Sequence, residues 1–275
     1  MTTPAVTTES AVSAAIMTVT IVTVAKDRRE HLERQFAGID AQTRPPDEHV
    51  IIDLGGPPIG ERPRTTVIGW DVDGRALPVG EARNRGAALA DSDVLIFLDV
   101  DCVPTPGLVA DYVDLVGEHP GIVCGPVGYL PALAPDVFFD GDGRLDTALL
   151  RAASSYHPGR PLPNEETRRS GRYELFWSLS FAVRRSTWND LGGFDNAFDG
   201  YGGDDTDLAW TARSGGSSCS SRVGPKRSTN ITRSAHRPGP DRLDTDVFTH
   251  RITAGIDSVV QMRQRTVITE PPMRS

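Results

Sequence analysis

The 275-residue sequence predicts an α/β fold in which a mostly parallel sheet is flanked by helices. Short runs rich in β-branched residues alternate with amphipathic segments of helical length between residues 18 and 127. One run, 94–98, is apolar throughout, which is typical of a strand buried on both faces of a sheet. Two carboxylates, Asp99 and Asp101, follow that run directly, so we expect the strand to end at a polar site.

The first elements follow from local residue patterns. Residues 18–25 are dense in β-branched side chains and predict a strand, and Asp27 with Glu30 predicts a capped start for the helix that follows. That helix places Leu32 and Phe36 on one face. This first helix is expected at 28–41. The same patterns then predict strands at 50–52 and 65–70, a helix at 80–90, the apolar strand at 94–98, a helix at 108–117 and a strand at 121–127.

The second half of the chain is less regular. Prolines and mixed charges between 131 and 172 predict a long loop, and alternation resumes with an expected strand at 176–183. A short helix around 187–191, a Gly-Gly turn and a glycine-rich acidic segment follow. We therefore expect a single domain at 18–213, a flexible tail at 1–17, and an irregular, partly disordered segment at 214–275.

Composition narrows the class of partner. The net charge of -8 argues against nucleic acid and favours metals or cationic groups. No run approaches the roughly 20 apolar residues of a membrane-spanning helix, so any membrane association would be peripheral. Cys102, Cys124 and Cys219 are widely spaced and form no metal-binding pattern, which favours reduced thiols in a cytoplasmic protein.

The pair Asp99 and Asp101 indicates a divalent metal site. On an extended backbone, side chains two residues apart share one face, so both carboxylates could approach one ligand. Such carboxylates repel each other unless a cation lies between them or one is protonated. A divalent metal that also contacts phosphate oxygens would satisfy both. An acidic turn at the end of a strand is the simpler interpretation of the same residues.

Four segments occur in an order that resembles the family 2 glycosyltransferases of the GT-A fold. They are Thr20–Ala25, Val50–Gly56, Ala82–Gly86 leading into Leu95–Asp101, and Gly192–Asp195 followed by Gly200–Leu208. The last segment also resembles that of galactosyltransferases and N-acetylgalactosaminyltransferases. The resemblance implies a Rossmann-like, GT-A type domain that binds a nucleotide-sugar, most often a UDP-sugar, with Mn²⁺ or Mg²⁺.

The resemblance also implies a donor-binding set. Asp101 falls on the metal-binding position of the family's DxD motif, and Asp99 on the position that supports the ribose or the metal's waters. Asp53 falls on the aspartate that binds the base, although an aspartate before Gly55 is also typical of a plain turn. Arg83 and Asn84 resemble a pair that contacts the donor, although a helix cap and a solvated arginine would explain them equally well. The remaining residue of the set is Ala25.

On the acceptor side, the resemblance places Asp205 at the position of the catalytic base. Asp204 stands where the family usually has glutamate, which shortens its reach toward an acceptor by one methylene. Helix capping by Asp204, with Asp205 and Asp207 in the first turn, would explain the same residues structurally. The other residues implied are Trp177, Tyr201 and Gly203 for the acceptor and His236 as a third metal ligand, with core packing the simpler explanation of Trp177.

The sequence thus predicts a metal-dependent, inverting glycosyltransferase that moves a sugar to a hydroxyl acceptor, which could be a glycan, a lipid-linked precursor or a small molecule. A phosphohydrolase of the haloacid dehalogenase type, with Asp99 as nucleophile, is an alternative from the same residues. The strand–helix units that precede Asp99 count against it. A non-catalytic protein that binds nucleotide-sugars or glycans is a second alternative.

Overall fold

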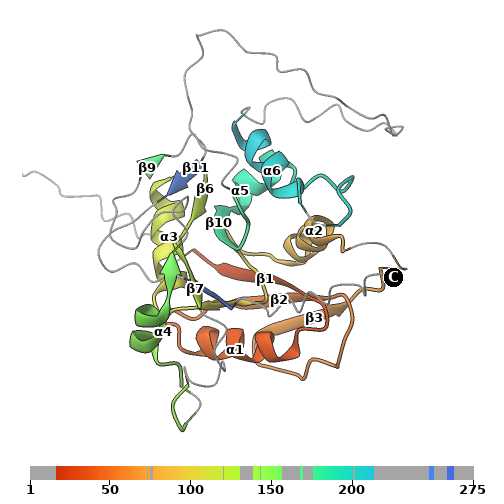
Figure 1. Ribbon diagram of the computed structural model, residues 1–275. Helices are drawn as coiled ribbons and strands as arrows, with labels where there is room; N and C mark the ends of the chain where they lie inside the picture. The colour runs from red at the N-terminus through yellow and green to blue at the C-terminus, as the bar shows by residue number, and fades with distance from the viewer. Residues whose placement is uncertain are drawn as a thin grey trace, which may run out of the picture.

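A mixed, mainly parallel sheet forms the centre of the computed structural model, which describes residues 17–72, 74, 77–119, 121–130, 139–142, 144–156, 168–169, 176–200, 202–213, 248–250 and 259–262. Its strand order is β3-β2-β1-β4-β10-β6-β11-β9 (Figure 1). A second, smaller sheet has the order β5-β12-β7-β8. The α/β class with a mainly parallel sheet, predicted from the sequence, is confirmed.

The first half of the central sheet is a run of four parallel strands. The strands are mostly buried, except the edge strand β3. The connections from β1 to β2 and from β3 to β4 pass through helices, whereas a loop joins β2 to β3. All four strands therefore end at the same edge of the sheet. The elements of this half are β1 (Val19–Ala25), α1 (Arg29–Asp40), β2 (Glu48–Asp53), β3 (Thr65–Gly69), α2 (Val79–Leu89) and β4 (Val94–Leu98).

The second half of the sheet is built around an antiparallel strand. β10 (Ser180–Arg184) lies antiparallel to both β4 and β6 (Ile122–Cys124). Beyond β6 come β11 (Phe248–His250) and β9 (Arg168–Arg169). The smaller sheet consists of β5 (Cys102–Pro104), β12 (Val259–Met262), β7 (Val127–Leu130) and β8 (Ser155–Tyr156).

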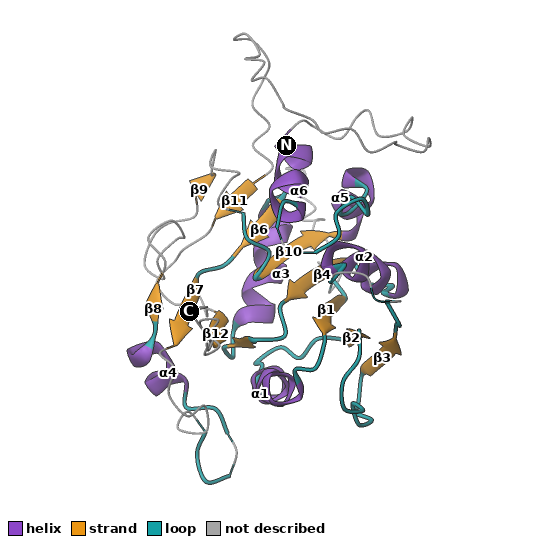
Figure 2. Cartoon of the chain, turned by 45° about the vertical axis from the view of Figure 1, so that its right-hand side comes forward, coloured by secondary structure: helices purple, strands orange, loops and turns teal. Residues whose placement is uncertain are grey.

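Helices cover both faces of the central sheet (Figure 2). Leu95 and Phe97 of β4 point to a face packed by α2, α5 (Arg185–Leu191) and α6 (Asp204–Arg213). The alternate residues of β4 point to the opposite face, which is packed by α3 (Leu108–Glu118) with Ile39 of α1. Phe97 stacks on Phe181 of β10, with ring centroids 4.6 Å apart, so aromatic packing joins the two halves of the sheet.

Two expectations about element ends are wrong. Asp27 does not cap α1: it has a φ of +50°, its N–H donates to the Gly55 carbonyl at 2.7 Å, and the helix begins at Arg29. The strand expected at 121–127 is divided into β6 and β7. Gly125 donates its N–H to the Tyr112 hydroxyl at 2.9 Å and Pro126 has no N–H, so two successive ladder bonds are lost.

The loop expected at 131–172 contains regular structure. α4 (Thr147–Ala153) lies within it, and Asp146 caps the helix by accepting the Leu149 N–H at 2.9 Å. The strand expected at 176–183 begins only at Ser180, because residues 176–179 turn toward α6. Most of the segments expected at 1–17 and 214–275 lies outside the described residues, apart from Met17, β11 and β12. Within the described part of the chain, no helix is long and apolar enough to span a membrane.

Candidate active site

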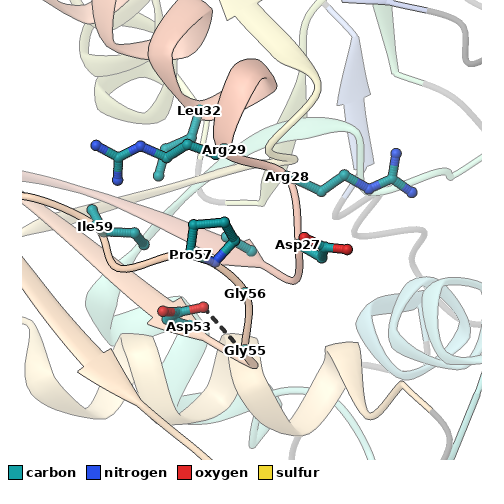
Figure 3. Close-up of a pocket in the computed structure, with 10 residues that line it drawn as sticks. Asp27, Arg28, Arg29, Leu32, Asp53, Gly55, Gly56, Pro57 and Ile59 are labelled. Carbon is teal, nitrogen blue, oxygen red and sulfur yellow. Dashed lines mark hydrogen bonds between the residues drawn. The ribbon is translucent and has the colours of Figure 1, made fainter.

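A pocket opens where β1 and β2 end (Figure 3). Ala25 and Asp53 are paired in register at the ends of these two parallel strands, so the sheet itself places them side by side. In parallel α/β sheets, ligands bind outside this edge. The pocket holds about 210 Å³ including its open mouth, and its lining consists of Ala25, Asp27, Arg28, Arg29, Leu32, Asp53, Gly55, Gly56, Pro57 and Ile59.

Tight backbone turns shape this pocket. Asp53 accepts the Gly55 N–H at 3.0 Å through Oδ1, which leaves its second carboxylate oxygen outside that turn (Figure 3). Gly56 has a φ of +126°, and a Cβ atom there would lie 2.8 Å from the Asp27 Cα. Only glycine fits both this conformation and this close approach. Asp53 was predicted from the sequence, whereas the loop residues that complete the pocket were not, because their approach depends on the tertiary fold.

The Asp-Val-Asp segment is a turn rather than a continuation of the strand. β4 ends at Leu98, and the Cys102 N–H donates to the Asp99 carbonyl at 2.9 Å, which closes a turn over 99–102. The expected extended geometry of Asp99 and Asp101 is therefore wrong. The two carboxylates nevertheless lie within electrostatic reach of each other, because the charge of Asp101 contributes to a raised pKa at Asp99.

Arg83 brings the two acidic segments of the site together. Its guanidinium is almost fully buried, with a side-chain exposure of 7%, in the middle of α2. Nη2 lies 2.6 Å from Asp99 Oδ1, and Nη1 lies 3.6 Å from Asp205 Oδ1 and 3.8 Å from Asp204 Oδ2. One arginine thus contacts the end of β4 with one nitrogen and the start of α6 with the other.

Burial and like charges shift the pKa values of this cluster. Burial raises the pKa of Asp99 to about 7; Arg83 opposes that shift and Asp101 adds to it. Burial, and then the charge of Asp205, raise the pKa of Asp204, whereas Arg83 lowers it. Burial lowers the pKa of Arg83, but the attraction of Asp99, Asp205 and Asp204 outweighs this, so its pKa rises overall. The cluster holds more carboxylates than cations, which favours binding of a further cation.

Asp205 lies in the first turn of α6. Its Oδ2 accepts the Ser178 N–H at 3.1 Å, whereas its Oδ1 is buried without a hydrogen-bond donor in the described part of the chain. The helix begins at Asp204, so Asp204 is its first residue and not its cap, as the alternative interpretation had it. Both residues lie in the first turn, where a carboxylate is favoured by the helix dipole. Ser178 was not identified from the sequence, because only a backbone N–H contributes.

The other predicted residues fall into three groups. Asn84 contacts the loop after α5: its Oδ1 accepts the Phe194 N–H at 2.9 Å, and its Nδ2 donates to the Phe194 carbonyl and the Asn196 Oδ1. Trp177 is half-buried beside Ser178, and Gly203 precedes α6 with a φ of +91°. Two predicted residues, Tyr201 and His236, lie outside the described residues.

The residues present fit a divalent cation that is bound partly by protein carboxylates and partly by the oxygens of a diphosphate. No group of three His, Cys, Asp or Glu side chains within the described ranges is arranged to hold a metal. Asp99 and Asp101 offer hard carboxylate oxygens, and Asp101 is only partly buried. Mg²⁺ is commonly bound by one or two carboxylates together with substrate phosphates, and Mn²⁺ favours the same oxygen ligands.

Comparisons with known proteins define the class. In a structure of GalNAc-T7 with UDP, GalNAc and Mn²⁺, the match covers 93% of this chain and 45% of that chain, at 15% sequence identity and a TM-score of 0.54. S. aureus TarS matches over 71% of this chain and 33% of its own length, at 11% identity and a TM-score of 0.50. The chain thus spans less than half the length of either protein. No curated protein matched by sequence. The fold is that of the GT-A glycosyltransferases.

A family model assigns the chain more narrowly. The model described as glycosyltransferase like family 2 matches residues 64–220, which is more than half of the chain. The chain therefore belongs to glycosyltransferase-like family 2. The matched range includes Arg83, Asp99, Asp101, Asp204 and Asp205, and it begins after the pocket formed by β1 and β2.

Proposed function

We propose that the protein is a metal-dependent, inverting glycosyltransferase that moves a sugar from a nucleotide-diphosphate-sugar to a hydroxyl acceptor. The observation that carries this proposal is the bridge made by Arg83, which holds Asp205 and the Asp99 end of β4 within one ion-paired cluster. This cluster supports the proposal because it brings the carboxylate proposed as base close to the strand end that would face the leaving diphosphate.

The donor would lie along the carboxyl edge of the parallel strands. Its base would enter the pocket lined by Ala25 and Asp53, and its diphosphate would reach the turn over 99–102. Asp101 would hold Mn²⁺ or Mg²⁺, and Asp99, which pairs with Arg83, would support the ribose or the metal's waters. When bound, the metal would stabilise the negative charge that develops on the leaving diphosphate. GalNAc-T7 was crystallised with UDP and Mn²⁺, which supports UDP-sugars as the first donors to test.

Asp205 would act as the general base. As the acceptor oxygen attacks the anomeric carbon, the bond from that carbon to the diphosphate oxygen breaks, and its electron pair leaves with the diphosphate. The hydroxyl proton passes to a carboxylate oxygen of Asp205, and attack from the opposite face inverts the anomeric centre. The Ser178 N–H at 3.1 Å fixes the orientation of this carboxylate. Trp177, Tyr201, Gly203 and Asp204 stay proposed acceptor contacts, Arg83 and Asn84 donor-side residues, and His236 a metal ligand.

A transfer assay with a panel of nucleotide-sugars and Mn²⁺ tests the proposal. Asp205→Asn should keep Mn²⁺-dependent UDP binding and lose transfer by about 10²–10⁴-fold, which is the typical contribution of a general base. Asp207→Asn, in the same helical turn, is the matched control and should keep transfer. Retained transfer in Asp205→Asn would refute the assignment of the base.

Metal dependence has its own test. Asp101→Ala should abolish the Mn²⁺-dependent part of UDP binding measured by calorimetry and leave uridine binding unchanged. Equal UDP affinity with and without Mn²⁺ in the wild-type protein would refute the metal-dependent mechanism.

The phosphohydrolase alternative is not favoured, because the family match and the fold are those of glycosyltransferases. Phosphoester hydrolysis that is lost in Asp99→Asn would restore it. A purely binding role would be favoured if donor binding occurred without transfer to any acceptor. The buried thiols of Cys102 and Cys124 support the proposed cytoplasmic location.

A further inference from the structure

A buried glutamine holds the turn that carries the two aspartates. Gln35 lies on α1 and is fully buried. Its Nε2 donates to the Asp99 carbonyl at 2.8 Å and to the Cys102 carbonyl at 3.2 Å, so one amide group contacts the first and the last residue of the turn. Asp99 and Asp101 thus project from a turn whose two ends are joined by a side chain of another element.

The direction of every hydrogen bond in this network can be assigned. Carbonyl oxygens only accept, so the NH₂ group of Gln35 must face the turn and its Oε1 must face Thr23. Thr23 Oγ1 lies 3.0 Å from Oε1 and therefore donates to it. The same hydroxyl lies 2.9 Å from His49 Nε2, so its oxygen accepts a hydrogen bond from the N–H of that nitrogen. The chain of donors runs from His49 through Thr23 to Gln35, and all three residues are buried.

We propose that Gln35 is a positioning residue for the metal-binding carboxylate of Asp101. This inference rests on the proposed function, because it concerns the same metal and diphosphate site. Arg83 contacts the carboxylate of Asp99, whereas Gln35 contacts the backbone at both ends of the turn. The two residues come from helices on opposite faces of the sheet, α2 and α1, so the turn is fixed from both sides. Groups that orient metal ligands typically change metal affinity by 10- to 100-fold when they are removed.

The chain contains a matched control in Gln42. It is also buried, its Nε2 donates to the carbonyls of Gly38 and Thr105 at 2.9 and 2.7 Å, and its Oε1 accepts the Val109 N–H at 3.0 Å. Gln42 thus resembles Gln35 in burial and in hydrogen bonding, but it contacts no residue of the turn over 99–102 in these bonds. Replacing either glutamine by methionine keeps the side-chain length and removes the amide.

The experiment compares Gln35→Met, Gln42→Met and the wild-type chain by calorimetry with UDP and with uridine, both in the presence of Mn²⁺. Uridine lacks the diphosphate and reports on the nucleoside pocket alone. We expect Gln35→Met to weaken UDP binding by at least about tenfold and to leave uridine binding unchanged. Gln42→Met should change neither affinity, although thermal unfolding should show both variants destabilised.

Each other outcome overturns the inference. Equal UDP affinity in the wild type and Gln35→Met would show that the turn needs no support from Gln35. Equal losses in both glutamine variants, or a parallel loss of uridine binding, would indicate a purely structural role. If Gln35→Met does not fold, Thr23→Val decides in the same way, because it removes the hydroxyl that orients the Gln35 amide. Failure of the wild-type chain to bind UDP or any other nucleoside diphosphate in the presence of Mn²⁺ would refute the proposed function, and this inference with it.

Discussion

Arg83→Met should destabilise the fold far more than an equivalent change on the same helix. The substitution keeps the apolar stem of the side chain and removes the guanidinium, so Asp99, Asp204 and Asp205 lose the cation that they share. Arg85→Met is the control, because Arg85 lies two residues along α2 and pairs with Glu81 at 3.0 Å while its own side chain is 50% exposed.

The contacts of Arg83 determine how much unfolding free energy the Arg83→Met variant should lose. Removing one partner of a buried ion pair costs about 3–5 kcal/mol of unfolding free energy. The side chains of Asp99 and Asp205 are 29% and 25% exposed, so water compensates in part and we expect a loss near the lower limit, about 3 kcal/mol. The pair of Arg85 with Glu81 is only half exposed on the arginine side, and such a pair near the surface contributes about 1 kcal/mol.

Urea unfolding at pH 5 and pH 8, in the absence of metal, measures this difference. The pKa of Asp99 is already raised to about 7 with Arg83 present, and it should rise further without the guanidinium. A carboxyl group whose pKa is raised on folding destabilises the folded state increasingly as pH rises toward that pKa. The gap between the wild type and Arg83→Met should therefore widen from pH 5 to pH 8. A loss no larger than that of Arg85→Met, or a gap that narrows with rising pH, would refute the role given to Arg83.

Two further predictions concern residues that support the site, His49 and Gly56. Burial and Arg62 lower the pKa of His49 to about 3. Below pH 6.5 the unfolded chain therefore binds a proton at His49 that the folded protein does not bind. The free energy of unfolding should fall by about 2 kcal/mol between pH 7 and pH 5. Replacing His49 by glutamine should abolish that part of the pH dependence in urea unfolding, and an unchanged slope would contradict the assignment. Gly56→Ala should lower the unfolding free energy by about 1–3 kcal/mol, because the new Cβ would be strained at positive φ and would lie too close to Asp27. Gly55→Ala should lower the unfolding free energy less, because its Cβ would meet nothing within 4 Å. Equal thermal shifts for the two glycine variants would show that the contact with Asp27 is unimportant.

The fold was largely predictable because its parallel half is encoded locally. Strand β4 is apolar at every position, and α1 carries Leu32 and Phe36 at helical spacing. The residues that the hydrophobic pattern places in the core are therefore the ones that are buried. The failures arose where distant groups compete for backbone bonds. The Tyr112 hydroxyl takes the Gly125 N–H and divides one expected strand, and α4 was missed although Asp146 precedes it as a capping residue.

The residues of the candidate site could be predicted from the sequence, but the contacts that join them could not. Asp99, Asp101, Asp204 and Asp205 carry charges that stand out beside glycines and apolar strands, so sequence alone identified them. The ion pairing of Asp99, Asp204 and Asp205 with Arg83 depends on α2 lying beside two segments that are over a hundred residues apart in the sequence. No local pattern reports such a contact, and the backbone N–H of Ser178 leaves no sequence signal at all.

The antiparallel pairing of β10 with β4 has a consequence for how the chain folds. Ser180 lies opposite Leu98, which precedes it by 82 residues, so a large loop must close before the aromatic rings of Phe97 and Phe181 can stack. Closure of such loops slows folding, since entropy is lost before contacts form. All residues of the pocket and of the Asp99–Cys102 turn leave the ribosome long before Asp205 does. We therefore expect the half that contains the pocket to assemble first, and Asp205, the proposed base, to be added last, when β10 docks.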